Sequence, residues 1–425
     1  MKTIERILKS APGVDAYRIT ESATQSYELF FVHKSLETVR ATDTVATSVT
    51  VYVDHDGKKG DSTFTVYRSM SEADMEKAVA AAVARARLVF NEPYALPEAG
   101  EINAELPTNM KDADMQALGA QIADAVFAAD TVEGGSINAC EIFLYRDTLH
   151  VINSNGVDKT QVTHRVMIEA IPTFTDDNQS VELYEDYRFT VFDPKAVTAE
   201  IARRMQEVRD RANAVRPQTP LTVNVLLRPQ EIQRMIGGLA RDLSYGSVYN
   251  HGNLHKIGDD LQSGGNGDKL TVTMKAITEG SERSAFFDED GTALNDTTVL
   301  ENGIVKSYHG DSRFGQYLGI EKPSGMLRCM KVAPGTLSEE KVKSAPYIEC
   351  ASLSGLQMDL YADYIGGEIR LAYYYDGEKT VPVTGITMSA KLSEVLAGLN
   401  LSENVCVDGA YEGPALIMLP NVAIL

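Results

Sequence analysis

Residues 46–67, ATSVTVYVDHDGKKGDSTFTVY, determine how the N-terminal half of the chain can fold. Val49, Val51 and Val53 alternate with polar or amphipathic neighbours, which is the period of a half-buried strand. The dipeptide Asp56-Gly57 favours a tight hairpin turn, and residues 64–67 supply the returning strand. The stretch therefore predicts an antiparallel β-hairpin.

A helix is predicted directly after this hairpin. Ser71 and Asp74 have the spacing of a weak N-terminal capping box. Apolar residues then recur at helical spacing, and the segment is rich in alanine, a strong helix former. The apolar stripe consists of Met75, Val79, Ala82, Val83, Ala86 and Phe90.

A similar unit follows about 125 residues later, an offset read from the printed sequence. Residues 164–170 and 184–192 have strand patterns, and the second ends in Phe-Thr-Val-Phe, which is similar to the Phe-Thr-Val-Tyr of residues 64–67. A helix should follow, with one apolar stripe running from Val197 to Val215. Both an internal duplication and two unrelated hairpin-helix units fit this pattern. A proline-punctuated segment near residues 91–110 is the candidate seam between them.

The C-terminal half has more strand patterns than helical ones. Residues 221–227 form an apolar run bounded by prolines, which predicts a buried strand. Residues 230–243 have helical spacing, although the pair Gly237-Gly238 weakens that prediction. Two hairpins are predicted at 297–306 and 369–383, with turns at Asn302-Gly303 and Asp376-Gly377, and a short helix is predicted at 389–399.

These patterns predict an α+β protein of two domains. At ~150 residues per domain, 425 residues fit two or three. We expect an N-terminal α/β domain over residues 1–216, built from the hairpin-helix units. We expect a C-terminal, β-rich domain over residues 217–425, largely antiparallel and barrel-like.

Composition limits the function. The formal net charge is −20 and the chain contains no concentrated Lys/Arg run, so nucleic acid and anionic membranes are disfavoured partners. Neutral or basic peptides are more plausible ligands. The chain contains no apolar run of ~18 residues, and the N-terminus lacks the apolar core of a signal peptide. Four scattered cysteines without a CxxC pair fit a reducing compartment, so a cytoplasmic location is expected.

The sequence offers few metal ligands. Among its seven histidines, only His251 and His255 stand close together, and a spacing of four would place both on one face of a helix. Gly252-Asn253 instead favours a polar loop, and an HExxH motif would need Glu where Gly252 stands. Asp259 and Asp260 could complete a different kind of metal site. A solvated loop is the simpler interpretation.

An acidic cluster at residues 287–291, FDEDG, suggests a calcium loop. The spacing of EF-hand ligands is absent, so a turn with solvated carboxylates is the better interpretation. The sequence contains no GxSxG or Walker A motif, and no GxGxxG placed after a strand.

Several segments taken together resemble the TldD/PmbA family, once described as modulators of DNA gyrase and now regarded as related to metallopeptidases. The resemblance covers most of the chain in the same order. Its segments are residues 49–89, 151–156 (VINSNG), 286–291 (FFDEDG), 297–315 with LENGIVK, 362–364 (ADY) and 376–385.

The chain departs from the catalytic branch of this family at the zinc site. That branch carries HExxxH shortly after the strand that resembles residues 221–227, whereas no histidine occurs here from 165 to 250. By eye the motif falls near Arg234-Met235, with Leu239 in the place of the second histidine. Only Cys406 lies near the position of the family's C-terminal zinc-binding cysteine.

The departure resembles the PmbA-like branch, also called TldE, whose members lack the zinc motif. This resemblance implies a non-catalytic, peptide-binding subunit that forms a homodimer, or a heterodimer with a TldD-like catalytic subunit. The complex would cleave unfolded peptides, with zinc in the catalytic partner and no cofactor in this chain. An extended peptide can be held through main-chain hydrogen bonds to a sheet edge, which requires no metal.

Two alternatives remain open. The chain could be an active metallopeptidase with an atypical metal site at His251 and His255. It could also be a non-enzymatic modulator of DNA gyrase, which the charge of −20 disfavours.

Overall fold

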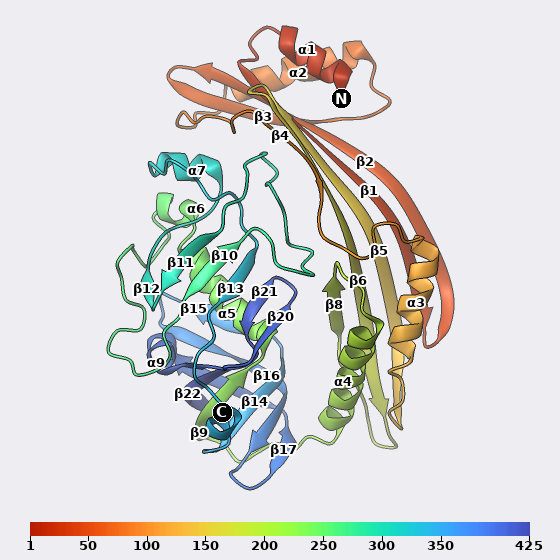
Figure 1. The fold of residues 1–425 in the computed structure, drawn as a ribbon, viewed down its shortest axis with the longest axis vertical. Coiled ribbons are helices and arrows are strands. Elements are labelled where there is room, and N and C mark those ends of the chain that lie inside the picture. The colour runs from red at the N-terminus through yellow and green to blue at the C-terminus, as the bar shows by residue number, and fades with distance from the viewer.

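The computed structural model describes residues 1–184 and 186–425 with their side chains, and the backbone of Glu185 (Figure 1). Its N-terminal half consists of α1 (Lys2–Ser10), β1 (Ala16–Val32), β2 (Ser35–His55), β3 (Lys58–Val66), α2 (Glu72–Ala86), β4 (Gly100–Glu105), α3 (Met115–Phe127), β5 (Gly135–Asn153), β6 (Val157–Thr175), β7 (Ser180–Glu182), β8 (Glu185–Phe189) and α4 (Pro194–Ala212).

The C-terminal half is composed mainly of short strands. Its elements are β9 (Leu221–Leu227), α5 (Pro229–Asp242), α6 (Tyr245–Tyr249), β10 (Val272–Lys275), β11 (Thr297–Glu301), β12 (Ile304–Val305), α7 (Ser312–Tyr317), β13 (Cys329–Val332), α8 (Glu339–Val342), β14 (Tyr347–Leu353), β15 (Gln357–Asp359), β16 (Tyr364–Tyr375), β17 (Thr380–Val383), β18 (Ile386–Lys391), α9 (Leu392–Gly398), β19 (Asn400–Leu401), β20 (Val405–Asp408), β21 (Tyr411–Pro414) and β22 (Ile417–Ile424).

A long, curved sheet dominates the N-terminal half. Its strand order is β3-β2-β1-β5-β6-β4, and β7 and β8 also pair with β6. The helices α1 and α2 cover its upper end, while α3 and α4 lie against its lower half (Figure 1). The sheet thus has two separate apolar cores, one under α1 and α2 and one under α3 and α4.

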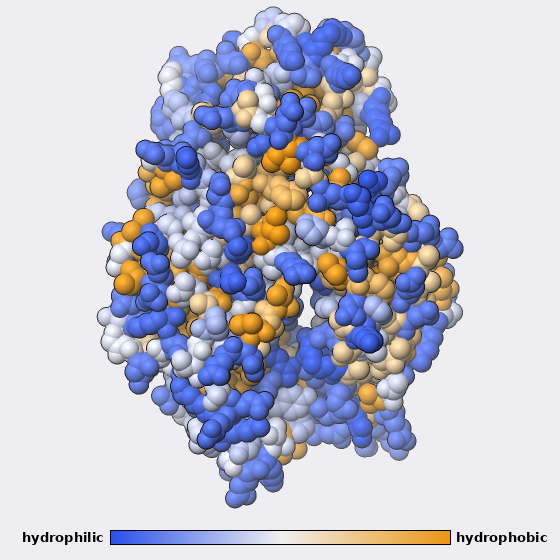
Figure 2. All heavy atoms as spheres, viewed as in Figure 1, coloured by the Kyte–Doolittle hydropathy of each residue, from blue (hydrophilic) through white to orange (hydrophobic). Residues whose placement is uncertain are grey.

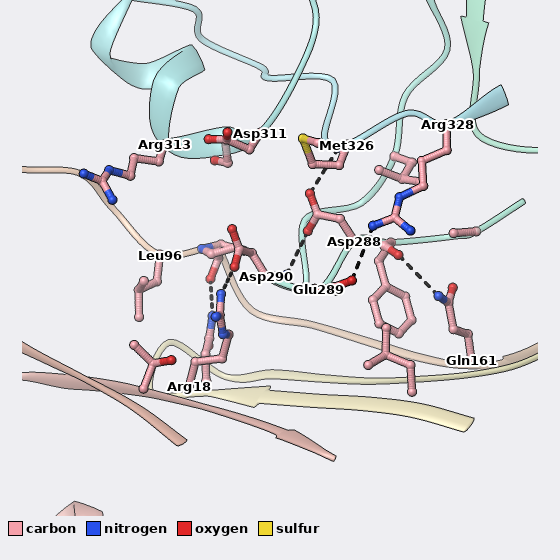
Figure 3. Close-up of a pocket in the computed structure, with 18 of the residues that line it drawn as sticks. Arg18, Leu96, Gln161, Asp288, Glu289, Asp290, Asp311, Arg313, Met326 and Arg328 are labelled. Atoms are coloured by element: carbon pink, nitrogen blue, oxygen red, sulfur yellow. Dashed lines mark hydrogen bonds and ion pairs between the residues drawn. The ribbon is translucent and has the colours of Figure 1, made fainter. Parts of the chain in front are cut away.

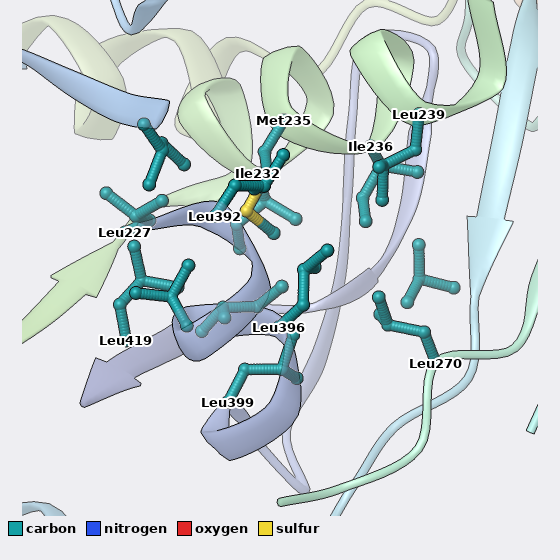
Figure 4. Packing of buried hydrophobic residues seen from close by; sticks show 14 of the residues in the cluster. Leu227, Ile232, Met235, Ile236, Leu239, Leu270, Leu392, Leu396, Leu399 and Leu419 are labelled. Carbon is teal, nitrogen blue, oxygen red and sulfur yellow. The ribbon is translucent and has the colours of Figure 1, made fainter. Parts of the chain in front are cut away.

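The C-terminal half contains a barrel and a second sheet. The strands β14, β9, β22, β18 and β16 pair in turn, and a further pairing of β16 with β14 closes the ring. The second sheet has the order β12-β11-β10-β13-β21-β20. The helix α5 packs between the two, where Ile232, Met235, Ile236 and Leu239 meet leucines of α9 (Figure 4). The predicted α+β class and the barrel-like C-terminal half are confirmed.

Local structure follows the sequence patterns closely. The 46–67 hairpin is confirmed, with Asp56 at φ 51° and Gly57 at φ 71° in its two-residue turn. The Ser71 hydroxyl accepts a hydrogen bond from the backbone N–H of Asp74 at 3.2 Å, as the capping pattern predicts. Asn302-Gly303 likewise adopts the positive φ angles of a type I′ turn.

One expectation differs from the structure. Residues 389–391 belong to strand β18 and not to the predicted short helix, because they pair with residues 364–366 of β16. The helix α5 forms despite its two glycines. A Cβ at Gly238 would lie 2.0 Å from the Met358 Cε, so a larger residue at this position would displace the end of the Met358 side chain. The domain boundary near 216/217 stays a prediction.

The face drawn in Figure 2 is mostly hydrophilic, with separate hydrophobic patches. Within the described part of the chain, no helix has both the length and the apolar character needed to span a bilayer.

Candidate functional site

A cleft of about 550 Å³ lies between the concave face of the long sheet and the loops of the C-terminal half (Figure 3). The sheet supplies the floor, including Arg18 of β1, Tyr52 of β2 and Gln161 of β6. The opposite wall consists of the loop 282–290 and the first turn of α7. The cleft therefore combines segments that are more than 200 residues apart in the sequence.

Phe287 fixes the acidic loop to the sheet. Its side chain is fully buried between Val151 of β5 and Val157 of β6. The Gln161 amide bonds the loop backbone twice, accepting from the N–H of Phe286 at 2.9 Å and donating to the carbonyl of Phe287 at 3.4 Å. Residues near 287 are thus held by both apolar packing and main-chain recognition.

Asp288 holds the turn from inside. Its side chain is buried and accepts hydrogen bonds from the backbone N–H groups of Asp290, Thr292 and Met326 at 3.0–3.2 Å (Figure 3). Burial raises the pKa of the Asp288 carboxyl above its ordinary value, although these hydrogen bonds oppose the shift. The expectation of a turn with solvated carboxylates is wrong for Asp288. Its carboxylate is buried, and backbone N–H groups donate hydrogen bonds to it in place of water.

The cleft carries an excess of negative charge. Arg18 is paired with Asp290, and Arg328 lies 3.3 Å from Glu289. Within the described part of the chain, Asp61 and Asp311 form no ion pair, and their carboxylates accept hydrogen bonds from Asn91 and the Phe314 N–H respectively. In total six carboxylates and four guanidinium groups line the cleft: Asp61, Glu282, Asp288, Glu289, Asp290 and Asp311, with Arg18, Arg283, Arg313 and Arg328.

One end of the cleft is aromatic. Tyr94 lies edge-on to both Tyr52 and Tyr317, with ring centroids 6.3 and 6.1 Å apart. The Arg313 guanidinium lies 5.2 Å from the Tyr94 ring centroid, within the range of a cation–π contact. Gln316 fixes the segment around Tyr94, because its amide both accepts from the Ala95 N–H at 2.8 Å and donates to the Ala95 carbonyl at 3.0 Å.

The two histidines proposed as metal ligands lie elsewhere, in the loop after α6. The His255 Nδ1 lies 3.0 Å from the Asp242 carboxylate, which also accepts from the N–H groups of Leu254 and His255. His251 is exposed, at a φ of 56°. Among the described residues, no three His, Cys, Asp or Glu side chains gather as potential metal ligands. Metal binding by this pair stays a prediction.

The helix α5 occupies the place where the resemblance puts the zinc motif. Met235 and Leu239 are buried in the C-terminal core (Figure 4), and Arg234 forms a 2.7 Å ion pair with Glu231. Cys406 lies on β20 and packs against the same core. Burial raises the pKa of the Cys406 thiol to about 11, which favours the protonated form over the thiolate that binds zinc.

Sequence reasoning missed most of the cleft. Asp61, Gln161 and Arg313 stand in unremarkable local patterns, and they meet only because the sheet curves toward the C-terminal half. Only the acidic cluster at 287–291 was singled out, and its contribution depends on contacts with residues 126 or more positions away.

Comparison with known proteins agrees with this architecture. Residues 220–424 match the family model of the PmbA/TldA metallopeptidase C-terminal domain. A zinc metalloprotease TldD homologue from Saccharolobus solfataricus is 26% identical over 150 residues, covering 33% of this chain and 30% of that protein. The chain thus aligns with about a third of that relative's length.

Solved structures share the whole fold. TldE from Thermococcus kodakarensis superimposes with a TM-score of 0.82 at 16% identity, covering 99% of each chain. A proposed modulator of DNA gyrase from Bacteroides thetaiotaomicron also gives 0.82, at 13% identity, over 100% of this chain and 97% of that one. Residues 220–424 therefore match the PmbA/TldA metallopeptidase C-terminal domain, and the whole chain shares the fold of these solved structures.

Proposed function

We propose that this protein is the non-catalytic, peptide-binding subunit of a zinc metallopeptidase complex whose catalytic subunit is TldD-like. The proposal rests on which residues the helix α5 presents at the expected zinc site. Where the catalytic branch is expected to present HExxxH, this helix presents the buried Met235 and Leu239 and the Arg234–Glu231 ion pair. None of the positions 234, 235 and 239 supplies the imidazole that a zinc site of that kind needs.

The cleft supports the peptide-binding part of the proposal. Its long sheet floor and its volume of about 550 Å³ suit an extended peptide segment. Its carboxylates outnumber its guanidinium groups, and three of its four arginines, Arg18, Arg283 and Arg328, are already paired with acids. We therefore expect it to favour peptides that carry lysine or arginine over acidic ones.

The purified protein is expected to contain no stoichiometric zinc and to cleave no unfolded peptide alone. Adding a TldD-like chain that has HExxxH, from the same organism, should produce zinc-dependent cleavage. Elemental analysis and mass spectrometry of a casein digest measure both quantities. Stoichiometric zinc bound to the lone chain, together with cleavage by it, would contradict the proposal.

A matched variant tests the alternative at His251 and His255. Replacing both histidines with alanine should change neither the metal content of the lone chain nor the activity of the assembled complex. Since His255 is bonded to Asp242, thermal unfolding of the variant must be measured as well. Loss of metal and activity from a folded variant would instead assign the chemistry to this loop.

Neutralising two cleft carboxylates should weaken the binding of basic peptides. In the double variant Asp61→Asn, Asp311→Asn, asparagine keeps the hydrogen bonds to Asn91 and to the Phe314 N–H but removes both charges. Affinity for an unstructured, lysine-containing decapeptide is expected to fall about tenfold, corresponding to ~1.4 kcal/mol. Fluorescence anisotropy at low salt measures this change, because added salt screens the interaction.

The control is Asp376→Asn, in the β16–β17 turn, whose carboxylate also accepts backbone hydrogen bonds but lies outside the cleft. It should leave affinity unchanged, and a glutamate-containing version of the peptide should bind the double variant more tightly than the control, because two repelling charges have left the cleft. Equal loss in the control and the double variant would rule out a specific role for the cleft.

A further inference from the structure

One guanidinium group in the cleft has no acidic partner. The other three arginines of the cleft, Arg18, Arg283 and Arg328, each form an ion pair with a carboxylate. Arg313 of α7 forms none with any described residue, although the chain has 60 acidic residues against 40 lysines and arginines. Its side chain is half-buried at the aromatic end of the cleft. The charge of Arg313 is therefore available to a ligand.

Neutral groups hold Arg313 in place. Its Nη2 donates to the Asn91 Oδ1 at 2.6 Å, and its Nε donates to the Tyr317 hydroxyl at 3.1 Å. The rings of Tyr94, Phe314 and Tyr317 lie around the guanidinium, with centroids 5.2, 5.6 and 5.6 Å from its Cζ. These contacts orient the guanidinium and leave its Nη1 without a hydrogen-bond partner among the described residues.

The nearby Asp61 orients this arrangement without pairing directly with Arg313. The Asn91 amide stands between the two charges, since its Nδ2 donates to the Asp61 carboxylate at 2.6 Å while its Oδ1 accepts from Arg313. The remaining N–H groups of Arg313 stay free for a ligand. A planar guanidinium with free N–H groups matches the two oxygens of a carboxylate.

The segment 91–97 joins the floor of the cleft to its wall at this end. Four of its residues, 94–97, line the cleft. Groups from the floor and the wall bond to the segment: the backbone of Lys59 on β3, the side chains of Gln316 and Tyr317 on α7, and the side chains of Asn153 and Asn155 at the end of β5. An extended peptide in the cleft would therefore end here and not pass through.

We propose that Arg313 binds the C-terminal carboxylate of the peptide, so that the cleft takes peptides by their C-terminal end. The inference rests on the proposed peptide-binding function and adds the end by which the peptide is held. In Figure 3, Arg313 and Arg328 lie at opposite sides of the cleft, with the acidic loop toward Arg328. A peptide anchored at Arg313 would extend toward this loop, where its basic side chains meet the excess of carboxylates.

The chemistry of the cleft favours a chain terminus over an acidic side chain as the carboxylate. Two groups of a peptide supply a carboxylate: an acidic side chain and the C-terminal residue. The carboxylates along the cleft repel an acidic side chain at most positions. The C-terminal residue instead brings its carboxylate to the very end of the peptide, where the segment 91–97 closes the cleft.

Fluorescence anisotropy with two forms of one peptide tests the proposal. The probe is a lysine-containing decapeptide, labelled at its N-terminus, with either a free C-terminal carboxylate or a C-terminal amide. The wild-type protein should bind the free acid about tenfold more tightly, because the amide cannot form the bidentate, charge-assisted pair. The net charge of −20 by itself predicts the opposite order, since the acid form carries one more negative charge.

The outcomes separate this inference from the proposed function. Equal affinities for the two forms, or tighter binding of the amide, would overturn the role of Arg313 and leave peptide binding intact. Failure of the wild-type protein to bind either form would contradict both.

Variants of Arg313 assign the preference to this side chain. Arg313→Gln should bind both forms equally, at about the affinity of the wild-type protein for the amide. Arg313→Lys keeps the charge but not the planar fork, so about two- to threefold preference should remain. The control Arg68→Gln removes the same charge from an exposed turn residue outside the cleft and should keep the full preference. Circular dichroism checks that each variant is folded. A tenfold preference that persists in Arg313→Gln, or that disappears equally in Arg68→Gln, would overturn the proposal.

Discussion

Replacing Glu207 with glutamine is expected to lower the free energy of unfolding by about 3–5 kcal/mol. Glu207 lies on α4 and is 2% exposed. Its carboxylate pairs with Arg203 at 2.8 Å, Arg204 at 2.9 Å and Arg228 at 2.5 Å. Glutamine has almost the same shape, so the variant removes mainly the charge and leaves the arginines without their shared counter-ion. Chemical denaturation followed by circular dichroism measures the loss.

The effect should extend beyond α4, because Arg228 belongs to the C-terminal half. It stands between β9 and α5, and its Nε also lies 2.8 Å from the Glu349 carboxylate on β14. Glu207 therefore ties the last helix of the N-terminal half to the barrel. Glu200→Gln is the matched control: Glu200 also pairs with Arg203 and Arg204, but its side chain is 24% exposed. The Glu200→Gln variant should lose no more than about 1 kcal/mol of unfolding free energy. An equal loss of stability in both variants would refute a special role for Glu207.

The same network predicts a pH dependence. Burial by itself raises the pKa of Glu207, but Arg204, Arg203 and Arg228 favour the charged form more strongly, so its pKa lies below its ordinary value. The unfolded chain then binds a proton at higher pH than the folded chain does. The stabilisation is present above the unfolded pKa of about 4.3 and is lost as the pH falls through the folded pKa. The stability gap between wild type and Glu207→Gln should hold at pH 6–7 and narrow below about pH 4.

Local sequence patterns predicted most of the helices and hairpins, because their causes lie within a few residues. The 46–67 hairpin follows from a two-residue period and a turn at Asp56-Gly57, and α2 follows from an apolar stripe and its Ser71 cap. The lengths of the strands were harder to predict from these patterns. The strand β5 runs unbroken from Gly135 to Asn153, a length that no local pattern in this part of the chain indicates. Pairing with β1 and β6 along nearly its whole length holds the weakly patterned middle of β5 in the sheet.

The cleft could not be predicted in this way, because its geometry depends on contacts distant in sequence. Lys159 illustrates the difficulty: it sits in an ordinary strand, yet its Nζ donates to the carbonyl of Gly291 at 2.7 Å. Burial lowers the pKa of this ammonium group, which sits beside the buried Asp288. No local pattern around residue 159 could indicate a partner 132 positions away. The family resemblance placed the acidic loop in a motif but did not show that it forms a wall of the cleft.

Replacing Phe287 with alanine is expected to destabilise the protein by about 3–5 kcal/mol and to abolish measurable peptide binding. The ring is fully buried against Val151 and Val157, so its removal leaves a cavity between the sheet and the loop of the cleft wall. Asp288 and Asp290 belong to that loop, and their positions depend on this anchor. Thermal unfolding and anisotropy with the lysine-containing decapeptide measure the two effects.

Two controls separate stability from binding. Phe90→Ala removes a ring that is 60% exposed and should change neither quantity by much. Leu419→Ala removes a fully buried side chain of the C-terminal core outside the cleft, and it should cost about 2–5 kcal/mol while leaving peptide affinity intact well below its melting temperature. If both core variants lose binding equally, reduced stability alone explains the loss. If only Phe287→Ala loses it, the contact between the acidic loop and the sheet is what gives the cleft its binding shape.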